Sequence, residues 1–330
     1  MASLESLGEP AWSPPHAAPP APRHAFAFTG SGVAFFALVA KNMLLTLLTL
    51  GIYLPWAKTE RRKYLWQNIE VAGHRLRYHG TGKELLVGYA KVAVAYLVFL
   101  AVNALAPKLL GATVGAVVQV AFVLLVVLVV PFAIWGARRY LLSRTSYRGV
   151  RFRLEGDARP FAKLFLTGYL LTMVTLGLYA PIWSNRMHRM LMNATALGTR
   201  AFEYRGDDRA VFRMAIKYFL LAFVTFGLSL FWYHAALARY QIENTWLDEA
   251  EGRLEVTGWE LFSLFLLQLF ATTLTLGLAF PWVTTYTMRF YLSRMTMVGQ
   301  VDFARIYRAE STGDASADGL ADALDVGIAL

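Results

Sequence analysis

Apolar and polar positions in this chain form long alternating blocks. Six apolar stretches of about 20 residues are separated by basic, aromatic segments, and they run 34–56, 85–106, 109–135, 161–183, 211–233 and 259–282. A helix of about 20 apolar residues crosses a hydrocarbon core of about 30 Å. Residues 111–135 contain no charge at all. The pattern predicts an all-α polytopic membrane protein with about six transmembrane helices.

One phrase, Thr-x-Gly followed by Pro-Trp, recurs in these stretches in recognisable form. Its copies begin at Thr49, Thr175, Thr225 and Thr275. Each copy leads into a basic, aromatic segment, and short runs such as residues 73–78 then alternate with the period of a strand. We therefore expect one repeated unit, made of a transmembrane helix, a short interfacial helix and a short β-strand.

The phrase itself has a structural interpretation. A threonine hydroxyl can bond back to its own helix and glycine permits close approach of helices, so Thr-x-Gly is expected to pack helices together in the membrane. Proline is expected to end the helix. Tryptophan prefers the boundary between lipid and water, so it is expected to mark the end of each span.

Composition changes the picture through charge. The chain carries a formal charge of +10 with 57% apolar residues and a mean hydropathy of +0.43. Its basic residues lie beside the apolar stretches, which favours anionic lipid headgroups as partners over nucleic acid. The candidate headgroup-binding residues are Arg61, Arg62, Lys63, Arg138 and Arg139.

The chain divides into three parts by composition. Residues 1–24 are a Pro/Ala-rich leader expected to be disordered, residues 25–310 are the repeated transmembrane domain, and residues 311–330 are an acidic tail. The leader has little positive charge and the first apolar stretch begins only after residue 32, so this region does not resemble a cleavable signal peptide.

Polar residues inside the apolar stretches are the candidate functional positions, because such groups are costly in lipid. Asn42 and Gln268 each lie nine residues before the glycine of their phrase. They could bond between helices or contact a polar solute or ion, and both interpretations stay open. The four phrase threonines complete the set. Lysines near the span starts are expected to extend toward the headgroups, namely Lys41, Lys91, Lys163 and Lys217.

No sequence motif indicates an enzyme. The chain has no cysteine, its six histidines lack metal-site spacing, and Gly30-Ser31-Gly32 lacks the third glycine of a dinucleotide loop. We therefore expect no catalytic residue, cofactor or metal.

Orientation is the unresolved part of the six-span prediction. Residues 107–108 form the connection poorest in charge, which places the basic segments 57–84 and 136–160 in the cytoplasm. Strict alternation would then put the basic segment 184–210 outside. Either a repeated span is re-entrant, or units face in opposite directions as in inverted-repeat transporters.

Several segments carry a resemblance to a known family. Residues 42–56 (NMLLTLLTLGIYLPW), 62–65 (RKYL), 78–86 (YHGTGKELL), 243–246 (ENTW) and 319–325 (GLADALD) closely resemble YjgN-like bacterial membrane proteins, a family of unknown function. The resemblance covers roughly residues 25–326. It implies a multi-pass protein of the bacterial inner membrane and supplies no catalytic residues. Gln268 departs from it, because that family typically has an asparagine there.

Two functions remain open from the sequence. The first is transport or sensing of a small solute or lipid, with Asn42, Gln268 and the phrase threonines as a polar lining. The alternative is an envelope scaffold that binds lipids or protein partners without a translocation path. Membrane lipids are the expected partners, a homo-oligomer is compatible with the sequence, and no substrate can be named.

Overall fold

The computed structural model describes residues 22–301. In this range the order strand, helix, helix, strand occurs five times, and we number these groups units 1 to 5. The elements of unit 1 are β1 (Arg23–Phe28), α1 (Gly32–Leu48), α2 (Leu54–Gln67) and β2 (Ile69–Val71); those of unit 2 are β3 (His74–Tyr78), α3 (Gly82–Leu110), α4 (Ala112–Ser143) and β4 (Thr145–Tyr147); those of unit 3 are β5 (Val150–Leu154), α5 (Ala158–Val174), α6 (Ala180–Asn193) and β6 (Thr195–Leu197). Those of unit 4 are β7 (Arg200–Tyr204), α7 (Asp208–Val224), α8 (Ser229–Glu243) and β8 (Thr245–Leu247), and those of unit 5 are β9 (Ala250–Leu254), α9 (Gly258–Leu274), α10 (Phe280–Leu292) and β10 (Met295–Val298).

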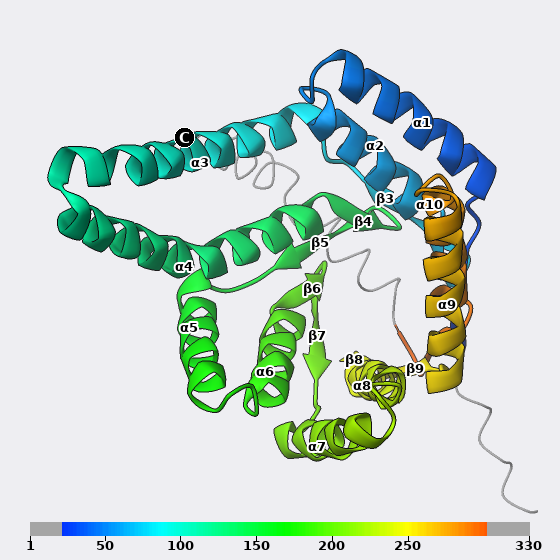
Figure 1. Ribbon diagram of the computed structural model, residues 1–330. Coiled ribbons are helices and arrows are strands. Elements are labelled where there is room, and N and C mark those ends of the chain that lie inside the picture. The colour runs from blue at the N-terminus through cyan, green and yellow to red at the C-terminus, as the bar shows by residue number, and fades with distance from the viewer. Residues whose placement is uncertain (1–21, 302–330) are drawn as a thin grey trace, which may run out of the picture.

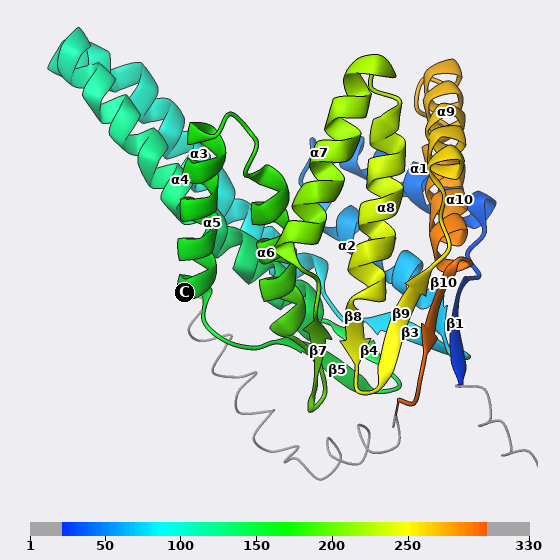
Figure 2. The ribbon, with the colours of Figure 1, turned by 90° about the horizontal axis from the view of Figure 1, so that it is seen from below.

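The strands form a closed antiparallel barrel in which β1 pairs with both β2 and β10. Successive units are joined by tight hairpins. In the first hairpin, Ala72 and Gly73 both have positive φ (47° and 80°), the conformation of a two-residue type I′ turn. The helices stand as a ring around the barrel, as seen down the ring in Figure 1. Figure 2 shows that they all rise on one side of the strands, with α3 and α4 extending farthest.

The prediction of an all-α protein with six transmembrane helices is wrong. Within residues 22–301, only α3 and α4, of 29 and 32 residues, are long and apolar enough to cross a membrane. The other four predicted spans are each a 17-residue helix, a turn and the beginning of a second helix. Hydropathy averaged over about 20 residues is equally high for one long helix and for an apolar helical hairpin, so it could not separate them.

The Thr-x-Gly phrase is the turn of these hairpins and does not pack helices together. Leu50 and Gly51 both have positive φ (50° and 93°), and the Gly51 amide donates to the Thr46 carbonyl oxygen at 2.8 Å, which closes α1 as in a Schellman motif. The Thr49 hydroxyl donates to the Leu45 carbonyl oxygen at 2.8 Å and accepts from the Tyr53 amide at 3.0 Å. One hydroxyl thus bonds both the last turn of α1 and the backbone just before α2. Thr175, Thr225 and Thr275 make the same pair of hydrogen bonds in their units.

The Pro-Trp part of the phrase also differs from expectation. Pro55, Pro181 and Pro281 stand in the first turn of the second helix, which they begin instead of ending the first. Trp56, Trp232 and Trp282 each lie against a glycine of the next unit, whereas Trp183 packs on Gly168 within unit 3. A Cβ added to Gly32 would lie 2.5 Å from Cδ1 of Trp282, and Phe36 stacks on the same indole with ring centroids 4.7 Å apart. This contact closes the ring between unit 5 and unit 1.

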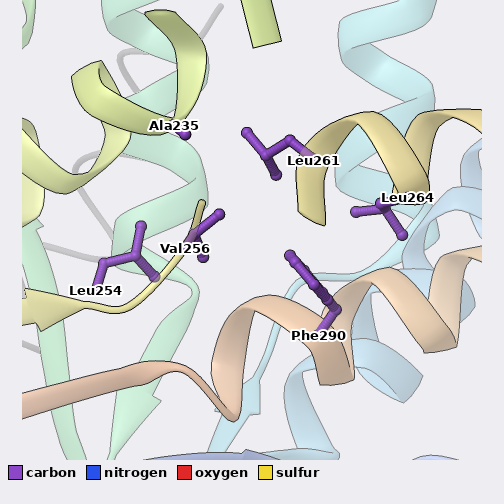
Figure 3. Packing of buried hydrophobic residues seen from close by; sticks show 6 residues of the cluster. All are labelled: Ala235, Leu254, Val256, Leu261, Leu264 and Phe290. Carbon is purple, nitrogen blue, oxygen red and sulfur yellow. The ribbon is translucent and has the colours of Figure 1, made fainter. Parts of the chain in front are cut away.

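Apolar clusters pack the bases of hairpins against the barrel in units 2 and 3 and in units 4 and 5. Figure 3 shows the cluster in units 4 and 5, where side chains from α8, the end of β9, the loop that follows it, α9 and α10 converge. Its members are Ala235, Leu254, Val256, Leu261, Leu264 and Phe290, all buried. The hairpins are therefore fixed to the barrel at one end, while their far ends carry exposed apolar residues.

Two predicted segments lie mostly or wholly outside the described residues. The acidic tail, 311–330, is outside entirely. Of the predicted leader, 1–24, the structure describes only residues 22–24, and β1 already begins at Arg23.

Candidate functional site: an apolar cavity in the barrel

A cavity of about 340 Å³ lies where the barrel meets the last turns of α6 and α8. Binding sites for small molecules are commonly about 300–1,000 Å³, so the cavity is within the range of a ligand site. Its wall is almost entirely apolar. Ten residues, one from each strand, form a continuous belt around it: Phe26, Val71, Leu76, Tyr147, Phe152, Leu197, Phe202, Leu247, Gly252 and Met297.

The register of the strands produces this belt. Phe26 pairs with Val71 and Leu76 pairs with Tyr147, and the other six belt residues pair in the same way. Because side chains alternate between the faces of a strand, the residues next to a belt position point outward in strands such as β3. In β3 these outward residues are Arg75 and Arg77, both exposed.

Gly252 is required by close approach of a helix. A Cβ at this position would lie 2.6 Å from the carbonyl oxygen of Ile242, in the last turn of α8. Ile242 lines the cavity together with Met192 and Ala238, which come from α6 and α8. The barrel therefore forms one side of the cavity and the lower turns of two helices form the other.

Few polar groups reach this cavity. His188 from α6 lines it, and its Nε2 is enclosed without a hydrogen-bond partner among the described residues. Burial, assisted by the positive charge of Arg138, lowers the pKa of His188 to about 4, so the imidazole is neutral at pH 7. Gln241 and Thr245 are further polar residues in the lining. An apolar wall with a neutral imidazole and an amide suits a hydrocarbon chain and offers no charged pair for acid-base catalysis.

A polar network beside the cavity is fully paired and structural. Asn185, completely buried in α6, donates to Asp208 Oδ1 at 2.8 Å and accepts from the Tyr204 hydroxyl at 2.6 Å. Arg186 and Arg189 meet the two oxygens of Asp208 at 2.6 and 2.8 Å. Burial alone would raise the pKa of Asp208, but these hydrogen bonds and charges hold it below its usual value. The network ties α6 to β7 and α7.

The predicted polar positions lie away from the cavity. Asn42 is only 3% exposed in α1, and neither atom of its amide group has a hydrogen-bond partner in the described part of the chain. Gln268 Nε2 donates to Thr287 Oγ1 at 2.9 Å, which joins the two helices of unit 5. The phrase threonines are at the hairpin turns. None of these residues is among those that line the cavity.

The predicted headgroup-binding residues occupy the barrel half of α2 and α4. Arg62 donates to the Tyr78 hydroxyl at 3.3 Å, while Arg61 and Lys63 are half-exposed. Arg139 is exposed. Arg138 differs, because its Nε is enclosed without a hydrogen-bond partner among residues 22–301.

The sequence-based prediction missed the cavity. Part of its signal was present in the strand-like runs 73–78, 149–154 and 198–204, which supply three of the ten belt residues, Leu76, Phe152 and Phe202. Among residues 22–301, no group of three or more histidine or acidic side chains is arranged to hold a metal ion.

A barrel with an apolar cavity, together with exposed apolar hairpins and two helices of membrane-crossing length, is typical of a membrane protein. The chain belongs to the family described as bacterial protein of unknown function (DUF898), whose model matches residues 23–232 and 218–323.

The curated relatives are named Inner membrane protein YjgN. The protein from Escherichia coli (strain K12) is 34% identical over 157 residues, which cover 48% of this chain and 37% of the relative. The protein from Salmonella typhimurium is 27% identical over 173 residues, covering 49% of this chain and 42% of the relative. The matched part thus spans less than half of these relatives. No solved structure matches the chain.

Proposed function

We propose that this chain is a bacterial inner-membrane protein that binds the hydrocarbon chain of a membrane lipid in the barrel cavity, for transfer or sensing of that lipid. The observation that carries the proposal is the closed apolar belt around about 340 Å³. The names of the relatives and the two long apolar helices support the membrane location.

The energetics favour exchange with the bilayer. A methylene group moved from water into apolar surroundings gains about 0.8 kcal/mol, so an aqueous chain is drawn strongly into the cavity. A chain arriving from the bilayer gains little from this effect, because lipid tails are as apolar as the cavity wall. A site of this kind can take up and release lipid at little net free energy, as transfer or sensing requires.

The chain length of the ligand provides the first test. The purified protein, held in amphipol to remove micelles, is titrated with dansyl-labelled undecanoic acid and the probe is displaced by saturated carboxylates of increasing length. Affinity should rise about fourfold for each added methylene and then level off as the cavity fills. Affinity that is independent of chain length would contradict a hydrocarbon site.

A cavity-filling variant provides the second test. Leu76→Trp places an indole inside the belt, and Ala201→Trp places the same group on the exposed outer face of β7. The first variant should lose the dansyl signal and the lipid that co-purifies with the protein, measured by mass spectrometry of solvent extracts. The second should retain both. Equal binding by the two folded variants would overturn the proposal.

The scaffold function has a separate observation in its favour. The outer faces of β3 and β5 carry exposed arginines at matching positions, namely Arg75, Arg77, Arg151 and Arg153. A surface of this kind attracts anionic partners. If Leu76→Trp leaves function in the cell intact while charge reversal of Arg75 and Arg77 abolishes it, the scaffold is the better description.

A further inference from the structure

Three lysines stand at one level of the helix ring. Lys41, Lys91 and Lys217 are each the tenth residue of the first helix of their unit, in α1, α3 and α7. Glu60 from the returning helix α2 meets Lys41 at 3.0 Å, so it lies at this level too. Lys163 in α5 stands about one turn nearer the barrel. We name the height of these three lysines the lysine level.

Four hairpins extend only a short way beyond this level. Their first helices continue for seven residues, 42–48, 168–174, 218–224 and 268–274, or about 10 Å at 1.5 Å per residue. The segments that include these ends and the turns, residues 42–57, 164–185, 218–238 and 261–288, contain no Asp, Glu, Lys or Arg.

The hairpin of unit 2 extends much farther. Beyond Lys91, helix α3 continues for 19 residues to Leu110, or about 28 Å. This length matches a hydrocarbon core of about 30 Å. Lys108 lies next to the turn at the far end, where a cation can reach the opposite headgroups. Figure 2 shows this hairpin projecting beyond the others from the same side of the barrel.

The turns of the four short hairpins carry an unusual residue. Leu50, Leu176, Phe226 and Leu276 have positive φ of about 50° and are 94–98% exposed. Glycine or asparagine adopts this conformation more readily. A large apolar side chain at all four turns has no packing role within the described structure, but it is stable in contact with lipid tails.

We propose that the chain enters the bilayer from the barrel side only: the four short hairpins reach into the acyl chains of the near leaflet, and the α3–α4 hairpin alone crosses to the far side. The barrel and every connection at its base then lie in the cytoplasm, because their arginines are retained there. The basic segment 184–210 shares this side with 57–84 and 136–160. Asn42 and Gln268 lie next to the lysine level, close to the headgroups.

The absence of cysteine permits a direct test on the full-length protein. Single cysteines at Arg75, Thr199, Glu249 and Lys108, all exposed, are treated with a membrane-impermeant maleimide in right-side-out and inside-out vesicles. The first three should react only from the cytoplasmic side and Lys108→Cys only from the outside. Opposite sidedness of Arg75→Cys and Thr199→Cys, or cytoplasmic reaction of Lys108→Cys, would overturn the proposal.

Depth is measured at the turns. A fluorophore attached to Leu176→Cys or Leu276→Cys should be quenched by lipids with nitroxide on the acyl chain several-fold more than by lipids with nitroxide on the headgroup, and should resist impermeant reagents on both sides. Attachment to Thr199→Cys is the control and should show the opposite order. Reaction of a turn cysteine from outside would mean that the short hairpins cross, and quenching no greater than that of the control would mean that they stay in water.

Discussion

The contact between Trp56 and Gly82 provides a sharp test of how the ring is held together. A Cβ added to Gly82 would lie 2.8 Å from Nε1 of Trp56, and closer still to two other atoms of the indole. Gly82 has an ordinary φ, so the backbone alone would accept alanine, and removing glycine's freedom in the unfolded chain would stabilise by about 0.4–1 kcal/mol. Overpacking against the indole costs about 1–3 kcal/mol. Gly82→Ala should therefore destabilise the protein by roughly 1.3 kcal/mol, the difference between the midpoints of these two ranges.

Thermal unfolding of the purified protein, followed by circular dichroism, checks the sign. Gly88→Ala is the matched control, because it lies in the same helix with no atom within 4 Å of the added carbon, and it should leave stability unchanged or raise it. In a Trp56→Ala background, Gly82→Ala should become harmless or stabilising, so the double-mutant cycle isolates the contact. If Gly82→Ala stabilises the native protein as much as Gly88→Ala does, units 1 and 2 are not joined through this indole.

Four further measurements follow from the described contacts. The pKa of His188 near 4, against 6.5 when unfolded, means that its contribution to stability is present above pH 6.5 and lost as pH falls toward 4, so His188→Gln should flatten the acid side of a stability-pH profile. Asp208→Asn should lower the free energy of unfolding by about 1–3 kcal/mol in denaturant titrations, because it weakens charged hydrogen bonds. Glu203→Gln, which affects only an exposed pair with Arg205, should change that free energy by less than about 1 kcal/mol. Thr275→Val removes the hydroxyl that serves both helices of unit 5 and should cost about 1–2 kcal/mol in the same titration, whereas no change would refute the capping role.

Local features of the fold could be predicted from the sequence more readily than its topology. The alternation in residues 73–78 and 149–154 indicated strands, and β3 and β5 occupy these positions. That the strands close into one barrel was not apparent, because β1 and β2 pair across an entire helical hairpin and β1 and β10 pair across almost the whole described chain. No local pattern records such distant partners.

The apolar stretches show a different limit. The apolar sequence around Thr49 and Gly51 favours packing residues within a span, although a glycine that follows a helix is also a sign that the helix ends. The high hydropathy of residues 34–56 outweighed that signal. The basic segment 184–210 carries the clue to this error. Counting each hairpin turn as part of a membrane crossing places this segment outside, although basic segments favour the cytoplasm.

The candidate site was harder to predict than the fold. The sequence favours Asn42 and Gln268 as functional positions, because polar groups in apolar stretches are often functional. The cavity is instead lined by apolar side chains on short strands, such as Phe152 and Phe202. In the sequence these residues look like ordinary core residues, because only the closed barrel brings them around one cavity. Because the belt takes one residue from each of ten strands, no single segment of the sequence predicts the cavity.

The closure of the ring has a consequence for how the protein is made. Arg289 donates to the Gly30 carbonyl oxygen at 3.1 Å, and Trp282 lies against Gly32, so the first unit acquires its last neighbour only after unit 5 has been synthesised. Until then β1 has an unpaired edge, which is prone to non-native strand pairing. Contacts between residues this distant also form slowly. Each helical hairpin can form locally as it is synthesised, but the cavity is complete only once the last strand has paired with the first.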